Sequence, residues 1–437
     1  MMEKLIIKNF AGLKSIEITI NKINIIIGPQ ASGKSIVAKL LFYFRSFVGE
    51  IVKSGIKLEP KQSLDKKLKN MFEEYFPPDA WGNALFEIQY SMQDKYIKIS
   101  GDTTGKPNSY KIALSYSDFY KKLLDQSRFL TRKIRNSVSP NYYEMWFEAM
   151  VFNQIQIQSI LKVQGSFSED SIFDQVFVPA GRSFFAVLKD NIFGVLSTDS
   201  QIDPFLIQFG QYYESIKRTA FDNSTDIKNK KRVWSTGAVD PGQTSLFDDM
   251  HRLHDNILSG KYVRLKDEDY LKSKDGRMVR LSNSSSGQQE ILPLILVLES
   301  LCFFSNGKMG TSTYIEEPEA HLFPRTQRDI ISLIATVYNF QPGRLHFFIT
   351  THSPYVLTAF NNLIQAGILS KSGHHDQVLE VMPASQVLDP DDVAAYHVVD
   401  GHAHNIIDPE TQLIDAQIID SISEELAIQF DQLLDIE

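Results

Sequence analysis

The sequence has a single cysteine, no excess of basic residues and no long hydrophobic run, and each shortage excludes a class of protein. Cys302 cannot form an intramolecular disulfide, which is typical of a protein from a reducing compartment. Acidic residues outnumber basic ones by 53 to 45, and the net charge of −8 excludes binding to nucleic acid by bulk positive charge. The most apolar stretch, residues 291–304, contains Glu299 and is too short to span a bilayer, so we expect a buried helix there.

The chain also shows no leader pattern, no internal repeat and no sustained heptad. Lys4 and Lys8 interrupt the apolar residues at the start, unlike a signal peptide. The absence of repeats and heptads excludes a long coiled-coil arm. With 43% hydrophobic and 22% charged residues among 437, we expect two or three folded units in a soluble, cytoplasmic protein with no membrane partner.

The pattern of apolar residues predicts an α/β fold. Residues 16–20 alternate apolar and polar side chains, typical of a half-buried strand, whereas residues 23–27 form an apolar run typical of a strand buried on both faces. From residue 291 the pattern is helix, strand 313–315, helix, strand 345–349, helix. Strands that alternate with helices predict a mostly parallel sheet.

Residues 28–35 fit the phosphate-loop pattern G-x-x-x-x-G-K-S, between a buried strand and a predicted helix. Glycines let the backbone curl so that successive N–H groups face a phosphate, and the helix start adds the positive end of its dipole. Lys34 would reach the β- and γ-phosphates, and the Ser35 hydroxyl would bind Mg²⁺. The sequence therefore predicts a nucleotide site formed by Gly28, Gln30, Ala31, Ser32, Gly33, Lys34 and Ser35.

A second candidate element is the strand that ends in Glu316 and Glu317. In a phosphate-loop fold this strand is expected to lie beside the phosphate loop, with its first acid directed to Mg²⁺. Because Glu316 is longer than the commoner aspartate, we expect its contact with the metal to pass through water. Glu317 would position or deprotonate the attacking water. The alternative interpretation is an acidic helix start, a position that carboxylates favour.

Two more segments could contact an anion. Ser285, Gly287 and Gln288 precede the apolar helix and could form an anion-binding helix start, although an ordinary N-cap by Ser285 or Ser286 with Glu290 behind it is the alternative. His352 follows strand 345–349, at the edge where parallel sheets bind ligands, and its imidazole could bind a γ-phosphate oxygen. A structural role for this histidine is the alternative.

The order of these four segments, G-x-x-x-x-G-K-S, S-S-S-G-Q-Q, Y-I-E-E-P-E and T-T-H-S, resembles that of ABC-type ATPase heads. The spelling E-E-P-E-A-H-L-F-P followed by T-T-H-S-P is similar to the AAA-like, OLD-like branch of prokaryotic defence ATPases, which includes the ATPase subunits of PARIS-type and Septu-type anti-phage systems. Residues 178–183 are less specifically similar to the same branch. The opening strand with Asn9 and Phe10 is similar to RecF and structural-maintenance heads.

The resemblance implies ATP and Mg²⁺ as cofactors and a head-to-tail homodimer, or a higher even homo-oligomer, in which each ATP lies between two subunits. Ser285, Gly287 and Gln288 would then contact the γ-phosphate in trans. Glu317 would be the catalytic carboxylate and His352 the switch histidine. A glutamine that touches Mg²⁺ or the water is also expected; Gln154, Gln156 and Gln158 are candidates, with a plain polar helix face as the alternative.

The spacing of the motifs also predicts how the chain is divided. We expect an ABC-type head with a mostly parallel sheet core, an N-terminal antiparallel strand region and mixed or helical inserted lobes. The predicted segments are a first core part (1–45), an inserted lobe (46–165), a return to the core (166–185), a mainly helical insertion (186–275), a second core part (276–375) and a C-terminal extension that could bind a partner (376–437). Within the extension, the apolar residues of 414–434 have helical spacing and should pack on the core or on a partner.

The resemblance favours an anti-phage sensor or scaffold that responds to a phage trigger protein or nucleic acid and controls a separately encoded nuclease or toxin. A RecF-like DNA-repair ATPase is the alternative, and it needs a basic surface. Candidates are Lys121, Lys122, Arg128, Arg132, Lys133, Arg135 and residues 228–232, which a solvated helix face explains equally well. The third hypothesis is a nuclease that uses His402 and His404 as a metal pair, against a polar hairpin with exposed histidines. OLD nucleases carry a Toprim nuclease domain after the ATPase. We do not expect such a domain in residues 376–437, because they are too few for it.

Overall fold

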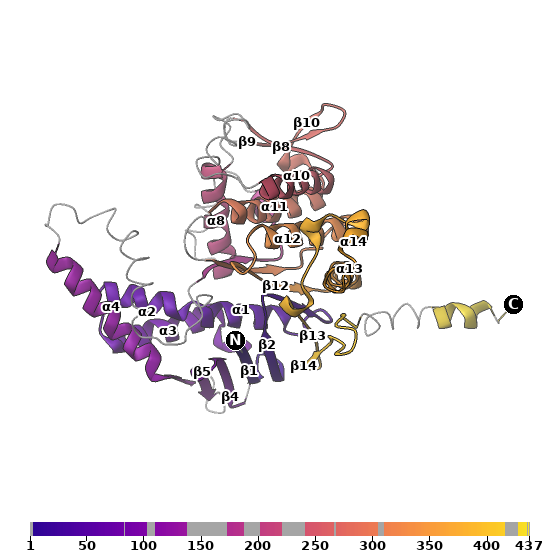
Figure 1. Ribbon diagram of the computed structural model, residues 1–437. Helices are drawn as coiled ribbons and strands as arrows, with labels where there is room; N and C mark the ends of the chain where they lie inside the picture. Colours follow the sequence, from indigo (N-terminus) through magenta and orange to yellow (C-terminus); the bar gives the residue numbers. More distant parts are fainter. Residues whose placement is uncertain are drawn as a thin grey trace.

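The computed structural model describes residues 3–82, 84–102, 110–137, 173–187, 202–220, 241–265, 268–304, 310–415, 427–434 and 436. Its central feature is an eleven-stranded mixed sheet (Figure 1). The strands stand in the order β6 (Lys111–Tyr116), β5 (Lys95–Asp102), β4 (Phe86–Met92), β1 (Glu3–Phe10), β2 (Leu13–Ile20), β14 (His402–Asn405), β13 (Val393–Val399), β3 (Ile23–Ile27), β12 (Leu345–Thr351), β11 (Thr311–Glu316) and β7 (Asp174–Val178).

The two halves of this sheet differ in direction. Strands β13, β3, β12, β11 and β7 pair in parallel, while β6, β5, β4, β1 and β2 pair in antiparallel. The expected fold class, a mostly parallel core with an N-terminal antiparallel region, is therefore confirmed. β4 to β6 lie between residues 86 and 116, so part of the predicted inserted lobe continues this sheet. The predicted segment boundaries stay predictions.

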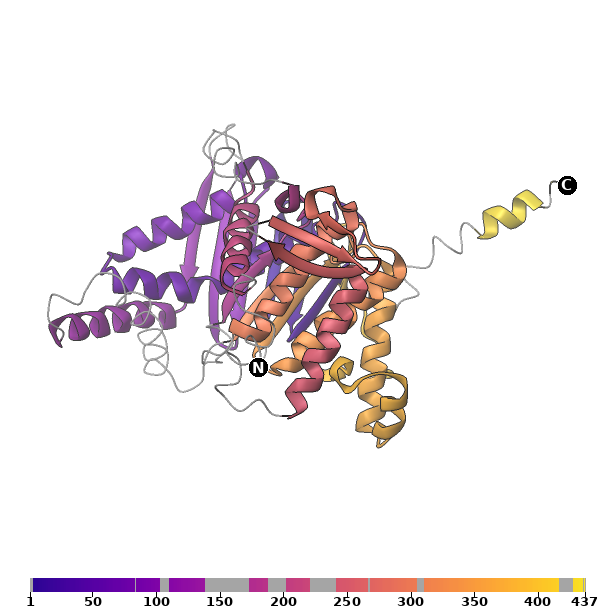
Figure 2. The same cartoon turned by 90° about the horizontal axis from the view of Figure 1, so that it is seen from above.

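Strand β3 explains why both faces of the sheet are covered. Successive side chains of a strand point to opposite faces, and here Ile25 and Ile27 belong to one hydrophobic core while Ile26 belongs to the other. The two cores take their helical residues from two groups of helices on different sides of the sheet (Figures 1 and 2).

The first group consists of α1 (Lys34–Arg45), α2 (Phe47–Ile56), α3 (Lys61–Tyr75) and α4 (Asp118–Ser137). The second comprises α6 (Phe184–Val187), α10 (Pro241–Ile257), α11 (Ser286–Phe304), α12 (Pro324–Phe340) and α13 (Pro354–Lys371), with α8 (Pro204–Ala220) contributing to both cores and α14 (His375–Val381) following α13. Residues 291–298 contain only buried side chains, so the predicted buried helix is confirmed within α11.

Two features of the fold were not part of the sequence prediction. Strand β12 lies between β3 and β11, so the acidic strand is not the neighbour of the strand that leads into the phosphate loop. Strand β13 pairs in parallel with β3, so the C-terminal extension supplies a strand of the core sheet. Both results depend on pairings between residues that are far apart in the chain, which local patterns do not encode.

Outside the central sheet, β8 (Gly260–Leu265), β9 (Glu268–Ser273) and β10 (Met278–Arg280) form a small antiparallel sheet beside α10 (Figure 1). Among the described residues, no helix combines the length and apolar character needed to cross a bilayer. The described residues 427–434 are helical, as their spacing predicts, but Ile428, Phe430, Leu433 and Leu434 are exposed, so they do not pack on the described core.

Candidate nucleotide-binding and catalytic site

The predicted phosphate loop joins β3 to α1, as its sequence requires. The loop curls through left-handed backbone at Ala31, with φ 61°, and at Gly33, with φ 95°. A Cβ at Gly33 would lie 2.5 Å from Leu13 Cδ2, and a Cβ at Gly28 would lie 2.1 Å from the carbonyl oxygen of Val398. Close packing against a backbone carbonyl therefore requires glycine at position 28 and ties the loop to β13, while at position 33 the left-handed φ favours glycine.

Lys34 is the first residue of α1 and is buried, with 5% of its surface exposed. Its Nζ donates to the carbonyl oxygens of Gly28 at 2.9 Å and Pro29 at 2.7 Å and lies 3.2 Å from His352 Nδ1. Burial lowers the pKa of Lys34 to about 8, although the charges of Glu317 and Glu319 oppose this shift. A partly desolvated ammonium at a helix N-terminus strongly attracts an anion such as phosphate.

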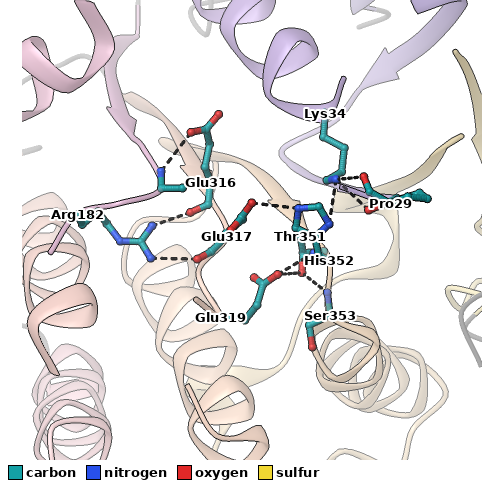
Figure 3. Close-up of polar contacts among 11 residues, drawn as sticks. Pro29, Lys34, Arg182, Glu316, Glu317, Glu319, Thr351, His352 and Ser353 are labelled. Atoms are coloured by element: carbon teal, nitrogen blue, oxygen red, sulfur yellow. Dashed lines mark hydrogen bonds and ion pairs between the residues drawn. The ribbon is translucent and has the colours of Figure 1, made fainter. Parts of the chain in front are cut away.

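His352 connects Lys34 to the catalytic candidate Glu317 (Figure 3). It directly follows β12, and its Nε2 lies 3.0 Å from Glu317 Oε1. A neutral imidazole can accept a hydrogen bond from Lys34 at Nδ1 and donate one to Glu317 at Nε2. Three of the four predicted segments are thus joined by one chain of polar contacts.

Glu319 holds His352 in place, and the sequence reasoning assigned this residue no role. Its Oε1 accepts hydrogen bonds from Thr351 Oγ1 at 2.6 Å and from the backbone N–H of His352 at 2.7 Å. The second carboxylate oxygen of Glu319 is buried without a hydrogen-bond partner. In the sequence, the signal for this residue is that it is the third acid of the E-E-P-E motif. A carboxylate that is buried requires a hydrogen-bond partner, which suggests a defined contact.

Glu316 ends β11 and has the features expected of a metal ligand. Its Oε2 accepts from the backbone N–H of Ala180 at 3.2 Å, while Oε1 is buried without a hydrogen-bond partner. An unpaired buried carboxylate oxygen is costly unless a cation or water satisfies it. Ser35, in the first turn of α1, would supply a hydroxyl. No group of three or more His, Cys, Asp or Glu residues in the described ranges could hold a metal alone, so Mg²⁺ would need nucleotide oxygens as further ligands.

The segment around Ser285 forms the N-cap of α11. Gln288 N–H donates to Ser285 Oγ at 3.3 Å, and Ser285 N–H donates to Gln288 Oε1 at 3.2 Å, so the capping alternative is realised with Gln288 in place of Glu290. A Cβ at Gly287 would lie 2.8 Å from the carbonyl oxygen of His321, so this glycine packs against the E-E-P-E-A-H loop. Within the described residues, Ser285, Gly287 and Gln288 form no hydrogen bond with the phosphate loop.

Arg182 has no role in the motifs, but it lies at the junction of β7, α11 and β11. It is fully buried, and its guanidinium donates to the carbonyl oxygens of Glu290, Pro179, Glu316 and Glu317. Burial lowers the pKa of Arg182, and the carboxylate of Glu290 is the first of the charges that oppose this effect. The V-P-A-G-R-S segment was the signal in the sequence.

The proposed basic surface on α4 is partly occupied by local contacts. Lys121 pairs with Asp118 at 2.6 Å, and Arg135 donates to the carbonyl oxygen of Ile56 at 3.1 Å. Arg128 pairs with Asp125 at 3.4 Å and also donates to the carbonyl oxygen of Glu59. Residues 228–232 and the glutamine candidates Gln154, Gln156 and Gln158 lie outside the described residues.

His402 and His404 lie on β14, which forms an antiparallel hairpin with β13, and both are exposed. The hairpin that was the alternative to a metal pair is therefore present. His402 Nδ1 lies 3.1 Å from the carbonyl oxygen of Asp400. No group of three potential metal ligands is present in the described part of the chain. His402 and His404 therefore have no third protein ligand there to complete a metal site.

The geometry of the site agrees with a comparison against protein families. Residues 209–357 match the AAA ATPase domain family. This AAA ATPase match includes Ser285, Glu316, Glu317 and His352 and begins well after the phosphate loop. It covers about a third of the chain. The search of curated proteins found no match.

Solved structures that match the chain are distant from it. The Smc head bound to the C-winged helix domain of ScpA is 12% identical, with 93% of this chain and 96% of that chain covered and a TM-score of 0.40. The SMC head domain from Thermotoga maritima is 12% identical, with coverages of 93% and 98% and a TM-score of 0.33. RecF of the RecFOR pathway is 11% identical, with coverages of 93% and 98% and a TM-score of 0.33. At these TM-scores the likenesses carry no inference about function.

Proposed function

We propose that this protein binds and hydrolyses ATP with Mg²⁺ and acts as a nucleotide-dependent switch. The observation that carries the proposal is the chain of contacts from Lys34 through His352 to Glu317. It joins the ammonium of Lys34, which would bind phosphate, to the carboxylate of Glu317. The imidazole of His352 between them contacts one group with each ring nitrogen. ATP hydrolysis requires such a combination, because catalysis of phosphoryl transfer is mostly positioning and electrostatic stabilisation.

Each residue of the site then has a defined task. The N–H groups of residues 28–35 and Lys34 bind the phosphates, and bound Mg²⁺ would neutralise phosphate charge while held by Ser35 and Glu316. Glu317 orients the attacking water and accepts its proton. His352 fixes the carboxylate of Glu317 through the 3.0 Å contact and itself lies within reach of a γ-phosphate. Glu319 holds the backbone of His352.

We further propose that two chains assemble head to tail, so that Ser285, Gly287 and Gln288 complete the ATP site of a second chain. Two facts support this assembly. These residues stand at a helix N-terminus, where backbone N–H groups favour an anion, and within one chain none of them is hydrogen-bonded to the phosphate loop. A nucleotide bound in this way would close two chains on each other and convert binding energy into a conformational change.

As the biological role, we propose a defence ATPase that senses phage infection and controls a separately encoded effector. The spelling of the E-E-P-E-A-H-L-F-P and T-T-H-S-P segments supports this role. A decisive measurement is protection of bacteria against a phage panel by the gene with its neighbours. Protection that Lys34→Ala abolishes supports the role, whereas protection unchanged by Lys34→Ala would contradict an ATP-driven switch.

The catalytic part of the proposal is tested by ATP binding and phosphate release from the purified chain. Lys34→Ala should reduce hydrolysis by about 10²–10³-fold, because it removes charge that the phosphates require. Lys39→Ala is the matched control, since Lys39 lies on the same helix but pairs with Asp203 at 2.6 Å. Equal hydrolysis by the wild type and Lys34→Ala would exclude this site as the source of activity.

A further inference from the structure

We propose that Arg182 is a positioning residue that holds the backbone of Glu317 in its active conformation and couples it to the first turns of α11. The inference rests on the proposed ATPase function and assigns a residue to which the motifs give no task. The Arg182 side chain contacts the backbone carbonyls of Glu316 and Glu317 and, within the described part of the chain, forms no hydrogen bond with their carboxylates. It acts on the catalytic carboxylate through the main chain that carries it.

The first observation is the strained backbone of Glu317. Its φ of 45° lies in the left-handed region, which a residue with a side chain adopts only when its surroundings impose it. Here the Glu317 N–H donates to the carbonyl oxygen of Thr350 at 2.8 Å, and Arg182 Nη2 donates to the carbonyl oxygen of Glu317 at 3.0 Å. The Glu317 carbonyl oxygen also accepts from the backbone N–H of Ala320 at 3.0 Å, so this backbone is held by β12, by Arg182 and by its own turn.

The second observation is the direction in which this backbone sends the side chain. Figure 3 shows Arg182 and His352 on opposite sides of Glu317. Arg182 Nη1 also donates to the carbonyl oxygen of Glu316 at 2.6 Å. Two successive carbonyls thus point toward Arg182, while the Glu317 carboxylate points the other way and meets His352 at 3.0 Å. Loss of the guanidinium would leave the Glu317 carbonyl with the Ala320 N–H as a donor and would thereby loosen the turn that sets this direction.

The third observation is the link from Arg182 to the helix that begins with Ser286. Glu290 lies on α11 and is 1% exposed; its Oε1 accepts from the backbone N–H of Arg182 at 2.9 Å, and its Oε2 accepts from the backbone N–H of Ser183 at 2.8 Å. Arg182 Nε returns a bond to the carbonyl oxygen of Glu290 at 3.2 Å. These contacts bind the loop after β7 rigidly to α11.

The consequence is a mechanical connection between two parts of the proposed composite site. Ser285 caps the same helix that Glu290 anchors, about one and a half turns apart. A displacement of α11 when Ser285 meets the nucleotide of a second chain would pass through Glu290 to Arg182 and from there to the carbonyl of Glu317. Engagement of the partner chain would thereby adjust the carboxylate that activates water. Such a residue controls kcat and leaves the affinity for ATP nearly unchanged.

The test compares three variants in the full chain, Arg182→Lys, Glu290→Gln and the control Arg45→Lys. Arg45 is also a buried arginine, which pairs with Glu3 at 2.7 Å and donates to Ser312 Oγ on β11 at 2.9 Å; among the described residues none of its hydrogen bonds reaches α11 or Glu317. Lysine keeps the charge of Arg182 but cannot serve carbonyls on several sides at once. Glutamine at position 290 presents an amide N–H₂ to one of the two backbone donors and so breaks one bond. Affinity for a fluorescent ATP analogue, kcat and melting temperature are measured for each.

We expect Arg182→Lys to bind the analogue within about twofold of the wild type while kcat falls by about tenfold to a hundredfold, as for a small misplacement of a catalytic group. Glu290→Gln should lower kcat in the same way by a smaller factor. The double variant should be no slower than Arg182→Lys alone, because both changes break one connection. Arg45→Lys should lower the melting temperature and leave kcat within about twofold.

Several results would overturn the positioning role. They are a wild-type kcat in Arg182→Lys, multiplicative losses in the double variant, or an equal loss of kcat in Arg45→Lys. If Arg182→Lys does not fold, a wild-type kcat in folded Glu290→Gln overturns it equally. Failure of the proposed function looks different, because the wild-type chain itself would then neither bind the analogue nor hydrolyse ATP.

Discussion

Lys34 and His352 are separated by 318 positions in the chain, yet Lys34 Nζ lies 3.2 Å from His352 Nδ1. The parallel pairing of β3 with β12 creates this contact, because it brings the carboxyl ends of both strands to one edge of the sheet. The register sets Ile27 beside Thr351, so the loop after each strand begins at the same level. The proposed ATP site depends on this pairing and on that of β11 with β12, which brings Glu316 and Glu317 to the same edge. Its properties can be tested residue by residue.

Replacing Glu317 with glutamine should keep ATP binding and stop turnover. Glutamine preserves the shape of the side chain and can still contact His352, but it cannot accept a proton from water. We expect kcat to fall by about 10²–10⁴-fold, the usual contribution of a general base. Binding of labelled ATP and single-turnover phosphate release measure the two effects, and Glu380→Gln on α14, which is exposed, serves as the control. Hydrolysis at the wild-type rate would show that Glu317 is not the base.

The rate should fall at alkaline pH because of Lys34. Burial lowers the pKa of this residue to about 8 from its usual 10.5, so the ammonium is present below pH 8 and is lost as the pH rises through that value. Since kcat/KM reports ionisations of the free enzyme, kcat/KM for ATP should decline above about pH 8. Lys34→Arg should lack this decline, because arginine stays protonated. A profile that is flat up to pH 10 in the wild type would contradict the assignment.

Composite sites should be detectable by mixing two inactive variants. Lys34→Ala destroys the phosphate loop and Ser285→Arg blocks the start of α11, so each homodimer has two defective sites. In a mixed dimer both lesions fall in one site, and the other site is intact. Phosphate release should therefore reappear on mixing, toward half of the wild-type rate per mixed dimer. If subunits exchange and no activity returns, the head-to-tail arrangement is wrong.

The chain should not cleave nucleic acid by itself. Phosphodiester cleavage usually requires two metal ions about 4 Å apart and held by several acids, and no group of three candidate ligands occurs in the described ranges. Purified protein is incubated with DNA or RNA, ATP and Mg²⁺ or Mn²⁺. Cleavage that persists in Lys34→Ala but disappears in the variant with His402→Ala and His404→Ala would instead support the nuclease hypothesis.

The sequence alone identified the parts of the site whose geometry is local. The curl of residues 28–35 follows from Gly28, Gly33 and the helix that begins at Lys34, all within a few residues, and the structure contains that loop between β3 and α1. The buried character of β3 and α11 was likewise visible in their apolar runs, because burial on all sides requires apolar side chains on all sides.

Only the tertiary structure determined the order of the strands and the contacts between residues that are distant in the chain. The insertion of β12 beside β3 and the pairing of β13 with β3 join residues more than three hundred positions apart. The contacts of Arg182 with Glu290 and Glu316 join residues more than one hundred positions apart. Such contacts depend on strand order and on the need of buried charged groups for partners, which act over the whole fold rather than along a segment. For that reason the motifs assigned tasks to Lys34, Glu317 and His352, while the tasks of Arg182 and Glu319 follow only from the contacts that the fold brings to them.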